Sequence, residues 1–321
     1  MRTRTMTASA LALAAALAIP ALTASAASGA AAPRGTSPYA PRLSFPMTLT
    51  TPAGTIHLAH PPTRIVSLSP TATEILYAIG AGKQVVAVDD DSNYPKTGLP
   101  TTRFNAFSPN VEQLIAMSPQ LVVVSYNPSN LEAQLAAAGI PVMEQDAPAN
   151  YGGTLKQITY LGDATGHYAH SLRVAKADRA DILKDIAKIP AHHRAASIYY
   201  ELSPPPYIYA AASDTFVGQL LKSLGVTNIA DPASNASNGG YPSLTDEYVI
   251  SASPKLIFLA DTICCKQSYA TVAARPGWKL ISAVKHHFVV RLNDDIASRW
   301  GPRVSILMDQ LTAAVLRYDR S

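Results

Sequence analysis

The chain has 321 residues, of which 48% are hydrophobic and 15% are charged, and its formal net charge is +4. This length suffices for two domains of ordinary size. The weak positive charge comes partly from the first residues and no basic stripe follows, so the composition does not indicate a nucleic-acid-binding protein. After the N-terminus, no apolar segment is long enough to span a membrane.

The N-terminus has the pattern of a secretory signal peptide, which we predict over residues 1–26. Basic residues precede an Ala-rich apolar stretch at 11–22, and Ala24-Ser25-Ala26 forms a small-residue cleavage site. We expect cleavage after Ala26 and export across the cytoplasmic membrane, to the periplasm, the cell envelope or the medium. No cysteine lies near this site, which excludes a bacterial lipoprotein anchor. Residues 27–45, rich in Ala, Ser, Pro and Gly, are predicted to form a disordered leader.

An N-terminal α/β lobe is predicted over residues 46–154. Most of its strands are short apolar runs without polar alternation, typical of strands buried on both faces of a parallel sheet. The predicted strands lie at 55–60, 65–68, 85–88 and 140–143, and a helix is predicted at 131–138. A further helix is expected to begin with Ser69 as N-cap, Pro70 in its first turn, and a capping box formed by Thr71 and Glu74.

One cassette of helix, Ser-Pro and strand occurs twice, at residues 111–124 and 246–259. Each copy has a glutamate near its start, Glu112 or Glu247, followed by an apolar pair, Ser-Pro and an apolar run. An acid suits the first helical turn because the helix N-terminus carries partial positive charge, and the proline ends the helix. The shared register indicates a duplicated α/β unit, with one copy in each half of the chain.

A linker is predicted over residues 155–190 and a C-terminal α/β lobe over residues 191–321. Apolar residues at helical spacing predict one long helix at about 168–188, with Gly162 and Gly166 interrupting the start of this helical segment. The second lobe is expected to contain a hairpin formed by 197–200 and 207–209, a helix at 216–224, a strand at 288–292, a loop at 294–302 and a final helix from about residue 303.

Several segments together carry a resemblance to one family over about residues 62–316. They are the run from Arg64 to Glu74, the two cassettes, Arg275-Pro276-Gly277-Trp278 with Ala283-Val284-Lys285, and Gly301-Pro302-Arg303. In order and spacing they are similar to the Fe/vitamin B12-type periplasmic substrate-binding family of ABC importers, whose members carry corrinoids, iron siderophores or haem. The resemblance implies two similar α/β lobes with parallel-type sheets, joined by one long rigid helix, and a ligand cleft between the lobes.

The resemblance also implies partners. Members of this family deliver cargo to the transmembrane subunits of an ABC permease with its ATPase, and a glutamate on each lobe docks against permease arginines. Glu112 and Glu247 match these positions, and paired surface acids would suit a two-fold permease. Helix capping is the alternative role for both. We expect a monomer that binds a small-molecule metal chelate, without a cofactor, a metal site of its own or a nucleic acid partner.

The candidates for ligand contact are aromatic and basic residues in the loops expected near the cleft. They are Tyr94, Arg103, Phe107, Tyr126, Tyr241, Arg299 and Trp300. The aromatic rings could wall a large chelate, and the two arginines could pair with carboxylates or catecholates of a siderophore, although each aromatic alone fits core packing equally well. We expect an iron-siderophore or cobalamin-type chelate as cargo, but Ala106, Ser125 and Asp91 stand where similar corrinoid binders tend to carry Trp, which weakens the corrinoid interpretation. Haem is the alternative cargo, with Tyr241 as its axial ligand.

Cys264 and Cys265 are the only cysteines, and they closely follow the apolar run of the second cassette. An intrachain disulfide would have to join neighbours whose Cα atoms lie ~3.8 Å apart, below the usual span of roughly 4.4–6.8 Å. A strained vicinal disulfide and two free thiols are both open. A secreted hydrolase that uses this redox-active pair is the alternative function. No catalytic motif surrounds the pair, so we expect no enzymatic activity.

Overall fold

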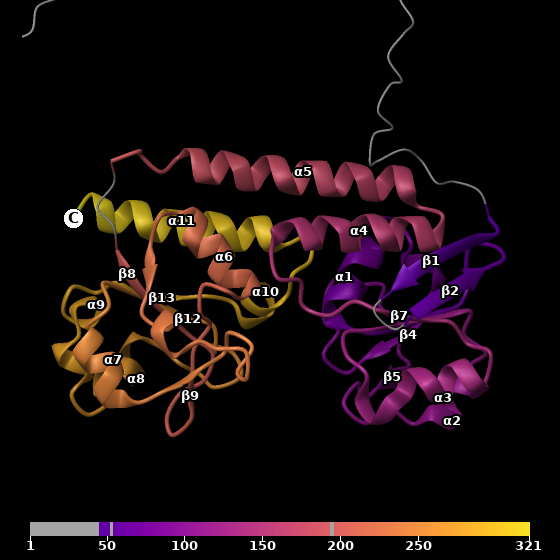
Figure 1. Ribbon diagram of the computed structural model, residues 1–321, viewed down its shortest axis with the longest axis horizontal. Coiled ribbons are helices and arrows are strands. Elements are labelled where there is room, and N and C mark those ends of the chain that lie inside the picture. The colour runs from indigo at the N-terminus through magenta and orange to yellow at the C-terminus, as the bar shows by residue number, and fades with distance from the viewer. Residues whose placement is uncertain (1–44, 52–53, 193–195) are drawn as a thin grey trace, which may run out of the picture. The chain divides into compact units, whose positions relative to one another are not determined.

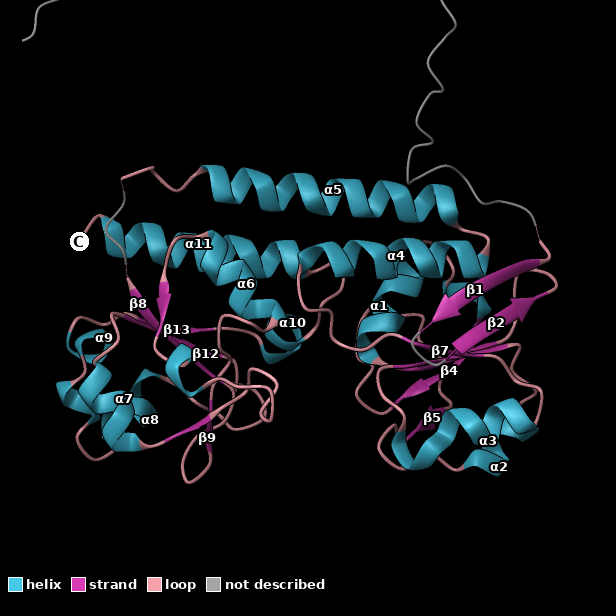
Figure 2. Cartoon of the chain, viewed as in Figure 1, coloured by secondary structure: helices cyan, strands magenta, loops and turns pink. Residues whose placement is uncertain are grey.

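The computed structural model describes residues 45–51, 54–192 and 196–321 (Figure 1). The described chain has two halves, each built on a parallel β-sheet with flanking helices, which confirms the predicted α/β fold of two lobes (Figure 2). No helix in these ranges is both long and apolar enough to cross a membrane. The predicted signal peptide and all but the last residue of the predicted leader lie outside the described residues.

The sheet of the N-terminal half has five parallel strands in the order β5-β4-β3-β6-β7. They are β3 (Ile65–Leu68), β4 (Val85–Asp89), β5 (Arg103–Phe104), β6 (Leu121–Val124) and β7 (Val142–Glu144). All residues of β3 and β6 are buried, as expected for central strands of a covered parallel sheet. The strand predicted at 55–60 is one member of an antiparallel pair, β1 (Met47–Thr51) and β2 (Gly54–Leu58).

The helices beside this sheet are α1 (Pro70–Ala78), α2 (Val111–Ala116) and α3 (Leu131–Ala137), with the 3-10 helices η1 (Gly82–Gln84) and η2 (Pro128–Asn130). α1 begins as predicted, because the Ser69 side chain accepts a hydrogen bond from the Ala72 N–H and Pro70 opens the first turn. The capping box predicted from Thr71 and Glu74 is wrong. The Glu74 carboxylate instead accepts hydrogen bonds from two arginines of the C-terminal half.

The halves are connected through α4 (Tyr151–Thr165) and α5 (Tyr168–Ala187), which pack along each other (Figure 1). The long helix predicted at about 168–188 is confirmed. Gly162 does not interrupt a helix, since it lies inside α4, where a Cβ would come within 2.0 Å of the Ser171 Oγ of α5. Gly166 ends α4 in the left-handed conformation that glycine adopts readily.

The sheet of the C-terminal half has four parallel strands in the order β10-β8-β12-β13. They are β8 (Ser197–Glu201), β10 (Thr227–Asn228), β12 (Leu256–Leu259) and β13 (Val289–Arg291). The predicted hairpin is wrong, because β8 is a central strand with parallel neighbours on both sides. β9 (Ile208–Tyr209) pairs antiparallel with β11 (Ser243–Leu244) instead, and a bridge between Glu201 and Ala210 connects it to the end of β8.

The helices of this half are α6 (Phe216–Ser223), α7 (Asp246–Ala252), α8 (Tyr269–Ala274), α9 (Ser282–Lys285), α10 (Asp294–Ser298) and α11 (Val304–Asp319), with η3 (Asp231–Ala233) and η4 (Trp278–Leu280). The loop predicted at 294–302 is wrong in its first part, since the Asn293 side chain caps α10 by accepting from the Ile296 N–H. Both cassettes fold alike, because α2 and α7 are each followed by a serine with positive φ, Ser118 or Ser253, before the proline and a buried strand. This agrees with a duplicated unit.

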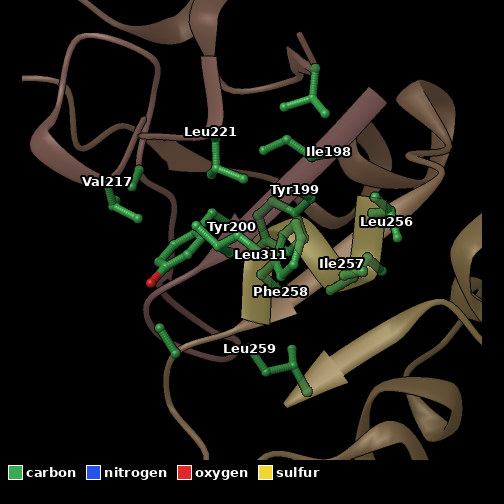
Figure 3. Close-up of a cluster of buried hydrophobic side chains, with 14 of the residues drawn as sticks. Ile198, Tyr199, Tyr200, Val217, Leu221, Leu256, Ile257, Phe258, Leu259 and Leu311 are labelled. Atoms are coloured by element: carbon green, nitrogen blue, oxygen red, sulfur yellow. The ribbon is translucent and has the colours of Figure 1, made fainter. Parts of the chain in front are cut away.

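The core of the C-terminal half supports the last helices of the chain (Figure 3). Tyr199, Tyr200 and Phe258, from β8 and β12, are fully buried in the same cluster as Leu311 of α11. Burying a side chain such as that of Phe258 stabilises the fold by roughly 1.5–3 kcal/mol. The Tyr200 hydroxyl also donates a hydrogen bond to the Ala297 carbonyl at 3.0 Å, so the core holds α10 in place.

Candidate functional site

The strand order of the N-terminal sheet reverses between the adjacent strands β3 and β6. Open parallel sheets bind ligands in the crevice outside the carboxyl ends of their strands, at such a switch point. The residues that follow β3 and β6 are Ser69 and Ser125, and their hydroxyl groups are hydrogen-bonded to each other. The sheet therefore brings the start of α1 and the loop after β6 to one place.

A pocket of about 380 Å³ lies at this switch point. Its volume falls within the range of roughly 300–1,000 Å³ that is usual for small-molecule sites. The lining residues come from the start of α1, the loop after β4, the residue after β6, and α10 with the two residues that follow it. They are Pro70, Thr71, Asp90, Asp91, Asn93, Ser125, Asp295, Ser298, Arg299 and Trp300. Both halves of the chain therefore build the pocket.

Three side chains, the buried Glu74 and Arg299 and the half-buried Arg303, join the two halves at this pocket, and we call them the interlobe clasp. Arg299 Nη1 donates to the Glu74 carboxylate at 2.8 Å, and Arg303 Nε donates to it at 2.7 Å. Arg299 Nη2 donates to the Asp295 carboxylate at 2.7 Å and to the Asp91 carbonyl at 3.0 Å. Glu74 is 2% exposed and Arg299 is 9% exposed, so the clasp is shielded from water.

The loop after β4 is held in place by Asp89 and Arg103. The buried Asp89 carboxylate accepts hydrogen bonds from the Ser92 hydroxyl at 2.7 Å and from the Asp91 N–H at 2.9 Å. Burial raises the pKa of Asp89, and these hydrogen bonds oppose the rise. Arg103 donates to the backbone carbonyls of Asp89 and Ser92. The loop thus presents Asp90 and Asp91 to the pocket with exposed side chains.

Among the predicted ligand-contact residues, Arg299 and Trp300 line the pocket. Trp300 is half-buried, and its Nε1 donates to the Gln157 Oε1 of α4 at 2.9 Å. Tyr94 lies against the Arg303 guanidinium, whose Cζ is 4.3 Å from the ring centroid, so this ring supports the clasp through a cation–π contact. Contact of these side chains with a ligand stays a prediction.

The remaining aromatic candidates, Phe107, Tyr126 and Tyr241, are not among the lining residues. Phe107 is 69% exposed and pairs with Tyr126, with ring centroids 5.5 Å apart. Burial, and then the charges of Asp89 and Asp91, raise the pKa of Tyr126, which places its hydroxyl near the acidic loop after β4. The Tyr126 hydroxyl is therefore buried, whereas the Phe107 ring faces solvent.

A second buried charge cluster lies at the carboxyl end of the C-terminal sheet. Arg275 donates two hydrogen bonds of 2.6 Å to the Glu201 carboxylate, and both side chains are buried. Asp261 is also fully buried, and burial followed by the charge of Glu201 raises its pKa to about 8. One guanidinium therefore faces two carboxyl groups, and Asp261 holds a proton at neutral pH.

Cys264 and Cys265 lie in an exposed loop as two free thiols. The Asp294 carboxylate anchors this loop by accepting hydrogen bonds from the backbone N–H groups of Thr262, Ile263 and Cys264. Although Cys264 is exposed as a residue, desolvation of its thiol, followed by hydrogen bonds with Cys265 and Asp294, raises its pKa to about 12. Cys264 is therefore protonated at neutral pH and does not supply the thiolate that nucleophilic catalysis needs.

Sequence reasoning missed several residues of this site. Asp90, Asn93 and Asp295 were not candidates, and neither were the clasp residues Glu74 and Arg303. Three consecutive aspartates at the carboxyl end of a predicted parallel strand were the available signal for the loop after β4. In the part of the chain that the structure describes, no group of three or more His, Cys, Asp or Glu side chains is placed to hold a metal ion.

Comparison with known proteins identifies the family. Residues 65–296 match the family described as periplasmic binding protein. The chain is 33% identical over 261 residues to the uncharacterized ABC transporter substrate-binding lipoprotein YvrC of Bacillus subtilis, covering 79% of this chain and 80% of that protein. It is 29% identical over 259 residues to the vitamin B12-binding protein of Vibrio cholerae, covering 78% and 88%. The solved structure of the periplasmic heme-binding protein RhuT from Roseiflexus sp. RS-1 matches with a TM-score of 0.70 and 25% identity, covering 80% and 98%. The chain therefore belongs to the periplasmic binding protein family.

Proposed function

We propose that the chain is the extracytoplasmic substrate-binding protein of an ABC importer, and that it captures an iron-siderophore or cobalamin-type chelate. The observation that carries this proposal is the pocket that both halves build at the switch point of a parallel sheet. The names of YvrC and of the vitamin B12-binding protein support it. The chelate is cargo in this function, so the protein binds and releases it without catalysis.

Delivery of the cargo requires a permease, with its ATPase, and Glu112 and Glu247 are the proposed contacts. Both side chains are exposed in the first turns of α2 and α7. These helices are already capped by Asn110 and Thr245, whose side chains accept backbone hydrogen bonds. Capping therefore does not require the glutamates, which supports docking over capping. Exposed acids of this kind would set register and encounter rate on a basic permease surface.

We propose that the chain works outside the cytoplasmic membrane. Family membership supports export. YvrC is named a lipoprotein, whereas the only cysteines of this chain are Cys264 and Cys265, far from the predicted cleavage site.

Haem is the second candidate cargo, because RhuT is named a heme-binding protein. Tyr241 is the predicted axial ligand, and it is 40% exposed. Burial and then the charge of Asp214 raise the pKa of Tyr241. Tyr241 also lies outside the set of pocket-lining residues. These observations favour a siderophore or corrinoid over haem.

Fluorescence titration of the mature chain tests the proposed function, because the two tryptophans occupy different environments. Trp300 lines the pocket, whereas Trp278 is fully buried in the core of the C-terminal half. We expect cyanocobalamin or a member of a ferric siderophore panel to quench the fluorescence saturably. The quench should shrink in Trp300→Phe, in which calorimetry still detects binding.

Two other results would change the functional conclusion. If neither fluorescence nor calorimetry detects saturable binding of any chelate or of haem, the proposed function is wrong. Turnover of an ester or amide substrate that disappears in Cys264→Ser would favour a secreted hydrolase instead. Thiol reactivity alone would not, because catalysis also needs a base near the thiol.

A further inference from the structure

The charges at the pocket do not balance. The interlobe clasp and Asp295 together contain two guanidinium groups and two carboxylates, joined at 2.7–2.8 Å, and are therefore neutral. Asp90 and Asp91 add two negative charges at exposed positions of the lining. Arg299 is the single Lys or Arg among the described lining residues, so the pocket carries excess negative charge.

Arg299 does not offset this excess for a ligand, because its donors are already in use. Nη1 donates to Glu74 and Asn93, and Nη2 donates to Asp295 and to the Asp91 carbonyl. Its side chain is 9% exposed. Both terminal nitrogens of Arg299 therefore already donate to protein groups. Neither is free to pair with a carboxylate or catecholate of the cargo, as the sequence had led us to expect.

We infer that the pocket selects metal chelates without net negative charge, and that Asp90 and Asp91 set this selectivity. The inference rests on the proposed function and adds the chemical class of its cargo. Carboxylates repel anionic groups and accept hydrogen bonds from amide and ammonium groups. The backbone at Asp91 is fixed by hydrogen bonds to Asp89 and from Arg299, so the loop that carries both acids is held in place before the ligand arrives. The favoured cargo is an amide-rich corrinoid or a cationic hydroxamate chelate.

Chelate pairs that share a shape and differ in charge test the inference. One pair is cyanocobalamin and its monocarboxylate, in which a side-chain amide is replaced by a carboxylate. The other is ferrioxamine B, which carries an ammonium group, and its N-succinyl derivative, which carries a carboxylate. Calorimetry gives Kd for each member at low and high salt, because added salt screens charge effects. For the pair that binds the wild-type chain, the carboxylate should raise Kd about tenfold at low salt.

The variant Asp90→Asn with Asp91→Asn removes both charges while keeping side-chain size and the backbone contacts. The difference in Kd within the pair should fall below about threefold in this variant. Asp181→Asn is the matched control, since it removes an exposed charge on α5 outside the pocket lining. It should keep the wild-type discrimination.

The outcomes separate this inference from the proposed function. Equal affinity for both members of a pair, tighter binding of the anionic member, or unchanged discrimination in the double variant would overturn the charge selectivity alone. In each of these cases a chelate still binds, so the proposed function stands. Failure of every chelate, haem included, to bind the wild-type chain would overturn both.

Discussion

The guanidinium of Arg299 lies 2.8 Å from the carboxylate of Glu74, although 225 residues separate the two in the sequence. Arg303 shares this carboxylate, so one buried glutamate joins α1 to the segment between α10 and α11. The halves are thus fastened at the pocket as well as through α4 and α5. Removing one partner of such a buried pair leaves uncompensated charge in a site with little water.

We expect Glu74→Gln to lower the free energy of unfolding by about 3–5 kcal/mol, because the buried Arg299 and the half-buried Arg303 lose the carboxylate that they share. Urea unfolding at pH 7 measures the change. Asp309→Asn is the control, because it breaks an ion pair with Lys188 between largely exposed side chains, and such pairs contribute little. Equal stability of the two variants would show that the clasp does not stabilise the fold.

Asp261 should make the stability of the protein depend on pH. Burial and then the charge of Glu201 raise its pKa to about 8, so the folded chain keeps a proton that the unfolded chain has released at neutral pH. This proton stabilises the folded chain fully below pH ~4, the pKa of an aspartate in the unfolded chain. The stabilisation is lost as the pH rises through 8, by about 1.4 kcal/mol for each pH unit between the unfolded and the folded pKa.

Asp261→Asn should remove this part of the pH dependence, since an amide keeps the shape of the protonated acid and does not titrate. We therefore expect the variant to gain stability relative to the wild-type chain between pH 5 and pH 9. Urea unfolding at both values gives the comparison. If the difference in free energy of unfolding between the wild-type chain and the variant is the same at both pH values, the raised pKa of Asp261 is wrong.

Cys264 should react slowly with alkylating reagents. Desolvation, followed by hydrogen bonds with Cys265 and Asp294, raises its pKa to about 12, so almost no thiolate is present at pH 8. In Cys265→Ser, the remaining thiol should react with iodoacetamide at least about tenfold more slowly than an unstructured cysteine peptide. A rate equal to that of the peptide would show that desolvation and Asp294 alone do not raise the pKa of Cys264. A thiol count that rises in the wild-type chain only after reduction would show that the vicinal disulfide forms.

The sequence predicted most elements whose partners are close along the chain or whose apolar pattern is unbroken. The buried strands of both cassettes and the long helix α5 followed from such patterns. Glu74 was different, because a glutamate three residues after Thr71 satisfies the local rule for a capping box. Its true partners lie 225 and 229 residues away, and no local pattern reports them.

The contacts at the pocket could not be predicted fully either, because they also depend on residues that are distant in the sequence. Arg299 and Trp300 were predicted as ligand contacts from their loop, and both line the pocket, but the sequence could not show that the arginine is already paired. The hairpin failed for a related reason. Two β-rich runs joined by a Pro-rich turn predict local pairing, whereas the first run became a central strand whose neighbours are β10 and β12.

The docking prediction concerns Glu112 and Glu247, which occupy equivalent first turns of the duplicated cassettes. Charge reversal of both to Lys should abolish uptake of labelled cargo by cells that carry the permease, because like charges across an interface repel. The same variant should keep the wild-type Kd for the chelate, since neither residue lines the pocket. Asp181→Lys, on the exposed face of α5, is the matched control and should support normal uptake. If the double reversal supports uptake equal to that of the control, the glutamates serve only the local electrostatics of α2 and α7, where an acid in the first turn is worth roughly 0.3–1 kcal/mol.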